Sequence, residues 1–299
     1  MRREDLYQKR ILDNLKEKHN LDSSRLNQRL QELKPTMVNL WKSYRTNSIE
    51  IDYSSEEVQE AYLFRYYTLY HRVAYLFLKN NLNTMDTMLS KRLLQIMFLG
   101  SGPGPEIVAL LSCMYKYYRD NERVTESIHI SNIDSNKWEY GTSLCSDHYY
   151  SWYKNEFKKI GIKLNFFKRV DANLIKCLNG TGLVFNAKFD ILYAQNLFNE
   201  IVDGINTQKF LNNFIKTGFN HGAVFFSSDR QNYQSVDNFF NNIRNSTLLN
   251  IISKEDVHTT SIYAIHSLLK SHLFSNESGL IPSNNAYSTQ RIFKINVSS

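Results

Sequence analysis

The sequence of 299 residues is poor in cysteine and histidine and has no long apolar run. Its three cysteines, Cys113, Cys145 and Cys177, have no C-x-x-C spacing, which argues against a disulfide framework or a structural zinc site. The eight histidines are scattered without ligand spacing, so we expect no metal. No apolar segment of the secretory type precedes the first helix, and the most hydrophobic stretch, 61–78, is interrupted by charge. We therefore expect an intracellular protein, cytoplasmic or nuclear, without a membrane segment.

The overall composition is that of a globular protein with a basic balance. Hydrophobic residues make up 42% of the chain and charged residues 22%, which excludes a disordered chain. The formal net charge of +7 permits a nucleic-acid partner but does not require one. RNA is therefore a candidate partner, and the composition does not favour any oligomeric state.

Residues 96–111, IMFLGSGPGPEIVALL, are the most informative part of the chain. An apolar run meets glycines at 100, 102 and 104 and then passes into a helical apolar pattern, which predicts a buried strand, a tight turn and a helix N-terminus. Such a turn lets a ligand approach bare backbone. The G-x-G-x-G spacing differs from the G-x-G-x-x-G of dinucleotide folds, and Glu106 directly after it disfavours a pyrophosphate.

The rest of the chain divides into a helical first part and an alternating second part. Helical apolar spacing covers residues 3–34, and a second helix follows Ser54. In that helix one stripe is predicted to face the core, namely Leu63, Tyr66, Tyr70, Val73 and Phe77. From residue 95 strands and helices alternate, which predicts a parallel sheet ending in an antiparallel hairpin. The expected strands are 95–99, 127–133, 162–170, 189–194, 223–228, 259–266 and 291–297.

Polar residues follow four consecutive predicted strands. Because ligands of open α/β sheets bind beyond the carboxyl ends of the strands, these residues are candidates for a site. Asp134 is placed to accept hydrogen bonds from ribose hydroxyls, and Asp171 with Ala172 is placed to meet an adenine amino group. A polar cluster, 195–200, follows the fourth strand, and Asp229 follows the fifth.

Together these residues resemble class I S-adenosylmethionine (SAM)-dependent methyltransferases over about residues 90–299. The resemblance implies SAM as cofactor and an α/β fold, a seven-stranded Rossmann-like sheet with a helical N-terminal extension. It divides the chain into a helical region, 1–87, and a SAM-binding domain, 88–299. In one departure, Phe98 stands where the family usually has an acid. The resemblance implies cofactor contacts at Gly100, Gly102, Gly104, Asp134, Asp171 and Asn196. Further candidates for cofactor binding are Arg65, Ser101, Glu106 and Ala172.

A narrower pattern resembles the fungal large-subunit rRNA uridine-N3-methyltransferases over about residues 60–235. It joins the segment AYLFRY at 61–66, the glycine turn, Ile133-Asp134 with Trp138, and N-x-x-N-E at 196–200. This resemblance implies methyl transfer to RNA, with a base nitrogen of rRNA as the candidate acceptor. Arg65 could then close over the cofactor carboxylate or touch a substrate phosphate.

The predicted chemistry is an in-line methyl transfer assisted by a base. Glu200, with Asn199, is the candidate base, and Asp229 is the second choice. No Pro-Cys follows the fourth strand, so a covalent pyrimidine-C5 mechanism lacks its thiolate. Two alternatives remain open: a small-molecule or protein methyltransferase with 1–87 as a lid, and a non-catalytic SAM-fold interaction subunit.

Overall fold

The apolar runs of the sequence form one mixed β-sheet at the centre of the computed structural model. The structure describes residues 3–46, 51–122, 124–167, 170–181, 185, 187–260, 265–274, 280 and 285–297. The strands of the sheet are β1 (Leu93–Leu99), β2 (Ser127–Asp134), β3 (Lys163–Phe166), β4 (Val170–Asp171), β5 (Phe189–Gln195), β6 (Phe219–Arg230), β7 (Leu249–Thr260) and β8 (Asn285–Ile295).

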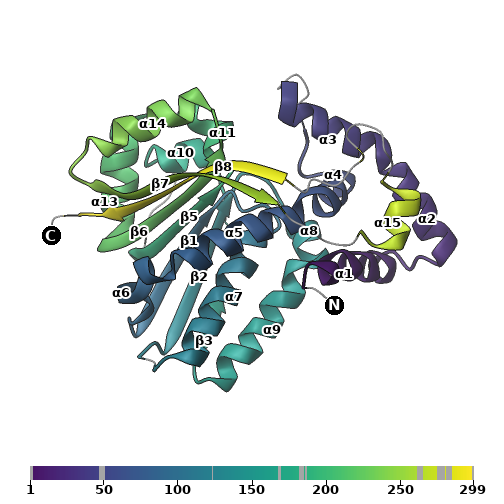
Figure 1. Cartoon of the computed structure of the whole chain (residues 1–299), viewed down its shortest axis with the longest axis horizontal. Helices are drawn as coiled ribbons and strands as arrows, with labels where there is room; N and C mark the ends of the chain where they lie inside the picture. The colour runs from purple at the N-terminus through teal and green to yellow at the C-terminus, as the bar shows by residue number, and fades with distance from the viewer. Residues whose placement is uncertain are drawn as a thin grey trace.

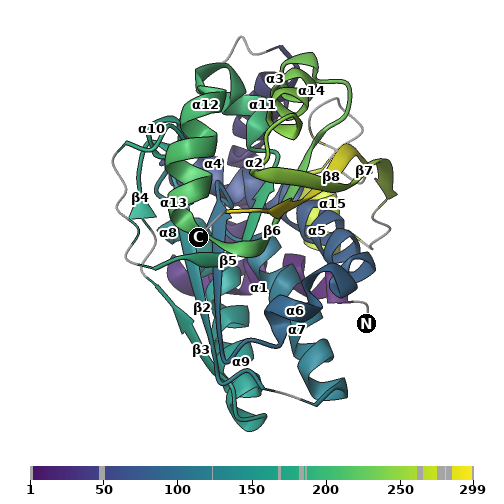
Figure 2. The same ribbon diagram turned by 90° about the vertical axis from the view of Figure 1, so that its left-hand side faces the viewer.

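The strand order confirms the predicted seven-stranded arrangement. It runs β3-β2-β1-β5-β6-β8-β7, with β3 and β4 pairing one after the other with β2 and so occupying a single position. The strands from β3 to β6 are parallel, whereas β8 is antiparallel to both β6 and β7. Figure 2 shows β3 and β7 at opposite edges of the sheet. The order reverses between β1 and β5, which places the ligand-binding switch point of such sheets beside the glycine turn.

Helices cover both faces of the sheet, as crossover connections between parallel strands require (Figure 1). One face carries α5 (Thr68–Asn80), α6 (Asp86–Leu89), α7 (Pro105–Asp120) and α9 (Ser146–Lys159). The other carries α10 (Leu174–Leu178), α11 (Phe198–Ile201), α12 (Thr207–Lys209), α13 (Lys216–Gly218) and α14 (Gln234–Arg244). Alternate residues of β1 serve the two layers, since Ile96 and Phe98 join the first core cluster whereas Met97 and Leu99 join the second.

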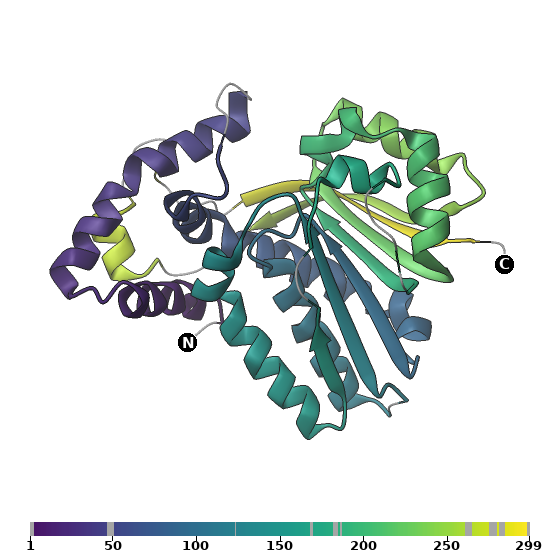
Figure 3. The same cartoon turned by 180° about the vertical axis from the view of Figure 1, so that it is seen from behind.

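The remaining helices lie beyond the sheet, at the end where the parallel strands finish (Figure 3). They are α1 (Arg3–Lys18), α2 (Ser23–Glu32), α3 (Lys34–Thr46), α4 (Glu56–Tyr62), α8 (Glu139–Leu144) and α15 (Ser267–His272). Buried Glu60 ties this end together: it accepts two hydrogen bonds of 3.0 Å from Arg29, and Tyr140 donates a third. The first core cluster joins side chains from both sides of residue 87, so the N-terminal helices share a core with the sheet.

Four predicted strands were wrong in their bounds. β6 extends beyond the predicted 223–228 at both ends, and β8 begins six residues before the predicted 291–297. The other two differ more. The strand predicted at 162–170 divides into β3 and β4, and the one predicted at 259–266 ends at Thr260, where β7 ends. β7 begins ten residues earlier than predicted. The prediction missed this part because β7 is an edge strand whose exposed Lys254, Glu255 and Asp256 break any apolar alternation. The helix after Ser54 also contains a π-helical segment, η1 (Leu63–Tyr67), which apolar spacing does not reveal.

Candidate active site

The glycine turn between β1 and α7 has the strained backbone that its sequence predicted. Gly100, Gly102 and Gly104 have φ values of 61°, 52° and 86°, all in the region that favours glycine. At Gly104 a Cβ atom would also lie 1.9 Å from the hydroxyl oxygen of Tyr150. Pro105 then opens α7, where its missing N–H costs no helical hydrogen bond. The backbone conformation of the turn therefore requires glycine. At Gly100 and Gly102 no side chain stands between the backbone and the cleft described next.

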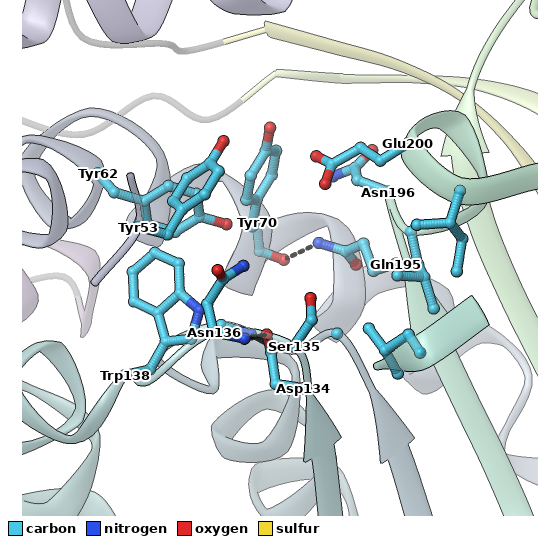
Figure 4. Close-up of a pocket in the computed structure, with 15 residues that line it drawn as sticks. Tyr53, Tyr62, Tyr70, Asp134, Ser135, Asn136, Trp138, Gln195, Asn196 and Glu200 are labelled. Atoms are coloured by element: carbon cyan, nitrogen blue, oxygen red, sulfur yellow. Dashed lines mark hydrogen bonds between the residues drawn. The ribbon is translucent and has the colours of Figure 1, made fainter. Parts of the chain in front are cut away.

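A cleft lies directly over this turn, at the carboxyl ends of β1, β2 and β5; we call it the first cleft (Figure 4). Its polar and glycine lining comes from the sheet side, and its aromatic lining from residues 53–70 and 138. The lining consists of Tyr53, Tyr62, Tyr70, Gly100, Gly102, Asp134, Ser135, Asn136, Trp138, Leu174, Gln195, Asn196, Leu197, Glu200 and Ile201. Four predicted cofactor contacts, at 100, 102, 134 and 196, and the predicted base at 200 thus come together in one cleft.

Asp134 links the end of β2 to the glycine turn. Its Oδ2 accepts a hydrogen bond of 2.9 Å from the Gly102 N–H, and its Oδ1 accepts one of 3.0 Å from the Asn136 N–H. Although the residue is buried, it lines the first cleft. A carboxylate offers about four acceptor positions, so two backbone bonds leave capacity for hydroxyl donors. Asp134 can both fix the turn and receive a ligand.

Glu106 is buried in the first turn of α7 and is not among the residues that line the first cleft. Burial raises the pKa of this carboxyl to about 8, and the charge of Asp134 adds to the rise. Its Oε2 has no hydrogen-bond partner among the described residues. Glu106 is accordingly protonated in the free protein at neutral pH.

The Glu106→Gln variant should therefore gain stability relative to the wild type as the pH rises. The unfolded carboxyl ionises near pH 4.5 and the folded one near pH 8, so the wild type loses about 3 kcal/mol between pH 4.5 and 7 through this group. Urea unfolding at several pH values measures the difference between the two proteins. A difference that stays constant with pH would contradict the assignment, and exposed Glu122→Gln serves as the control.

Glu200 lies at the start of α11 with its carboxylate in the first cleft (Figure 4). The side chain reaches solvent through the cleft, but protein surrounds it and raises the pKa of its carboxyl to about 7. Arg230 opposes this rise, whereas Asp134 and Asp229 increase it. A carboxylate that titrates near neutral pH is suited to act as a general base and take a proton from a reacting nitrogen or oxygen.

Asp229 and Asn199 were predicted as further catalytic residues, and the structure gives them other surroundings. Asp229 is fully buried and accepts a 3.1 Å hydrogen bond from the Phe198 N–H, a second from the Asn199 N–H, and one from the Ser227 hydroxyl. It thereby holds the start of α11, like a helix cap. Asn199 is not among the residues lining the first cleft, and its amide has no hydrogen-bond partner among the described residues. Asp229 is therefore bonded to the start of α11 and is not among the residues that line the first cleft.

Four of the remaining predicted cofactor contacts are not among the residues that line the first cleft. Asp171 pairs with Asp134 in the sheet register, but its side chain lies outside the described part of the structure. Ala172 donates its N–H to the Asp134 carbonyl at 2.9 Å. Ser101 is buried in the turn, and its hydroxyl has no partner among the described residues. Arg65 does not line the first cleft but a neighbouring one.

This second cleft adjoins the first at Tyr70 and Asn196, which line both. It lies between the helix segment 65–73 on one side and the carboxyl end of β6 and the start of β8 on the other. Tyr66, Tyr70 and Val73 line it on the helix side. All three belong to the stripe that was predicted to face the core, and all three are buried.

The aromatic wall of the first cleft was missed by sequence reasoning. The rings of Tyr62 and Trp138 meet edge to face at 5.0 Å between centroids, and Tyr53 lies 5.5 Å from Trp138. Gln59 holds the two segments together by accepting from the Gly141 N–H and donating to the Lys137 carbonyl, each at 2.6 Å. Aromatic residues at helical spacing gave a signal, but it is the same signal that a core face gives.

In the described ranges no group of three or more histidine, cysteine, aspartate or glutamate side chains is arranged to hold a metal ion. Over those same ranges, no helix combines the length and the hydropathy that crossing a bilayer requires.

No protein-family model and no curated protein sequence matches the chain. Among solved structures it is similar to a candidate class I SAM-dependent methyltransferase of Listeria monocytogenes, at 11% identity and a TM-score of 0.43, over 98% of this chain and 88% of that one. It is also similar to a candidate sarcosine dimethylglycine methyltransferase of Galdieria sulphuraria, at 9% identity and a TM-score of 0.41, covering 87% of this chain and 98% of that one. The O-methyltransferase TomG of Streptomyces achromogenes, solved with SAM, gives 10% identity and a TM-score of 0.37, over 87% and 96% of the two chains. Similarity at this level carries no conclusion about chemistry, which must come from the site itself.

Proposed function

We propose that the chain is a SAM-dependent methyltransferase and that the first cleft binds the cofactor. One observation supports this most: the glycine turn, Asp134 and Glu200, which are distant in sequence, line the same cleft at the switch point of the sheet. The position of Glu200 in this cleft favours catalysis over a non-catalytic interaction subunit, because a protein that only binds a partner makes no use of a proton acceptor there.

The lining fits the three parts of SAM. Gly100 and Gly102 offer backbone without side chains for the amino-acid moiety, and a Cβ at Gly102 would come 3.5 Å from the Trp138 ring. Asp134 supplies acceptors for ribose hydroxyls. Leu174 and Leu197, with the aromatic wall, supply an apolar surface of the kind that a purine needs. The absence of an acid at Phe98 leaves the cofactor ammonium to other groups of this cleft.

Transfer then depends on alignment and on one proton. When bound, SAM supplies a methyl group on a sulfonium leaving group, so no covalent enzyme intermediate is needed. The methyl group would pass from the bound cofactor to an acceptor nitrogen or oxygen, and the Glu200 carboxylate would take the proton that the acceptor loses. Asp229 keeps α11 in place and so fixes the position of Glu200.

RNA is the acceptor class that we favour within this function. The net charge of +7 and the arginines of the second cleft support it, as does the resemblance of the segment at 61–66 to rRNA methyltransferases. The alternatives of a small-molecule or protein acceptor use the same chemistry at Glu200.

Binding of ribosomal RNA should weaken steeply with salt. Each phosphate contact on single-stranded RNA contributes a slope of about −0.7 in log K against log salt, so several contacts give a large fall between 50 and 200 mM. Fluorescence anisotropy with labelled RNA fragments measures the slope, and SAM affinity in the same buffers is the control. A flat response, together with transfer of labelled methyl to a protein or small-molecule fraction, would contradict the RNA assignment and leave the methyltransferase assignment intact.

A further inference from the structure

Among the described residues that line the second cleft, the charged ones are both arginines. Arg65 and Arg230 line it, and no carboxylate is among the described residues that do so. Arg65 is buried in the π-helical segment, and its guanidinium lies 5.2 Å from the centre of the Tyr66 ring. Arg230 lies at the end of β6 and is close enough to Glu200 to lower that group's pKa. A guanidinium has five donors, so a bond to a neighbour leaves others for a ligand.

Two buried hydroxyl groups lie on the same side of the sheet as Arg230. Ser228 is two residues before Arg230 on β6, and Ser288 is opposite Arg230 on β8. Residues two apart on a strand, and residues directly opposite across a ladder, share a face. The exposed fractions of Ser228 and Ser288 are 1% and 4%, and neither hydroxyl has a hydrogen-bond partner among the described residues. Buried hydroxyls are costly unless a protein group, a water molecule or a ligand satisfies them, so these two are available to a ligand that enters the cleft.

Aromatic rings form the walls of this cleft. Tyr66 and Tyr70 are stacked at 5.5 Å with an angle of 11° between their planes. Two rings that hold each other parallel offer a rigid surface for a planar ligand.

We propose that the second cleft binds the methyl acceptor and selects a planar ring that carries an oxyanion, a phosphate or a carboxylate. Arg65 and Arg230 bind the oxyanion together with the hydroxyls of Ser228 and Ser288, and the tyrosines contact the ring. Tyr70 and Asn196 belong to both clefts, so an acceptor seated here has its reactive edge beside Glu200. This inference rests on the proposed methyltransferase function and narrows its substrates to anionic ones.

Paired probes, of which only one member carries the oxyanion, test this selection. Uridine 5′-monophosphate is compared with uridine, and 4-hydroxybenzoate with 4-hydroxybenzamide, by calorimetry on the full chain with and without saturating S-adenosylhomocysteine. We expect at least one anionic probe to bind at least tenfold more tightly than its neutral partner. If uridine 5′-monophosphate binds more tightly than uridine, the acceptor is a nucleotide. If 4-hydroxybenzoate binds more tightly than 4-hydroxybenzamide, the acceptor is a small acid.

Variants assign the selectivity to the cleft. Arg230→Gln and the double variant Ser228→Ala/Ser288→Ala should each reduce the preference for the anionic probe, Arg230→Gln by at least tenfold. Arg244→Gln, which removes the same charge from an exposed position on α14, should leave it unchanged. Equal affinity for charged and neutral probes, or a preference that survives Arg230→Gln, overturns the proposal. Because S-adenosylhomocysteine binding is measured separately, its failure would count against the methyltransferase function and not against the anion site.

Discussion

Asp134→Ala should weaken SAM binding at least a hundredfold. The substitution removes the acceptors that we assign to the ribose hydroxyls, and it also releases the N–H groups of Gly102 and Asn136 that shape the turn. Hydrogen bonds to a charged group contribute about 1.5–3 kcal/mol each, so two lost ribose bonds alone account for this factor. Calorimetry with SAM and with S-adenosylhomocysteine measures it.

Asp190→Asn is the matched control, because Asp190 is also a buried strand aspartate. It lies at the start of β5, away from the first cleft, and pairs there with Lys91. It should bind SAM as the wild type does. If Asp134→Ala fails to fold, Asp134→Asn keeps the shape of the side chain and should still weaken binding tenfold or more. Unchanged affinity in a folded Asp134 variant contradicts the placement of the cofactor.

Glu200→Gln should lower kcat by a factor of about 10²–10⁴ and change SAM affinity less than threefold. The amide keeps the size of the side chain but cannot take the acceptor's proton. Single-turnover transfer to the identified acceptor separates the chemical step from binding. An equal loss of SAM affinity would show that Glu200 holds the cofactor instead.

The pH profile gives the same residue a second test. Since the raised pKa of Glu200 is about 7, wild-type activity should rise between pH 6 and 8 as the carboxylate forms, and then level off. Glu200→Gln should lose this rise, whereas Glu255→Gln, at an exposed position on β7, should keep it. A wild-type profile that is flat across this range would exclude Glu200 as the base.

The parts of the site that local sequence specifies could be predicted. The turn at Gly100–Gly104 depends on backbone conformations that glycine allows, and Asp134 follows its strand directly, so neighbouring residues suffice to place them. Asp229 shows the limit of this reasoning. An acid after a strand can face a ligand or cap the next helix, and here the carboxylate accepts the N–H of Phe198.

The parts that depend on tertiary contacts could not be predicted. The wall formed by Tyr62 and Trp138 joins residues 76 positions apart (138 − 62), and nothing in either segment indicates the other. Tyr66 was predicted to face the core and does belong to the first core cluster, but the sequence did not indicate that it also lines the second cleft, because buried cleft residues and core residues have the same helical spacing. The bounds of β7 were missed because an edge strand exposes charge on both faces.

A crystal structure of the chain with S-adenosylhomocysteine tests the central claim most directly. We expect the ribose hydroxyls within hydrogen-bond distance of Asp134, the amino-acid moiety against the backbone of Gly100 and Gly102, and the sulfur facing Glu200. A ligand bound elsewhere, or a first cleft that stays empty at saturating ligand, would contradict the account.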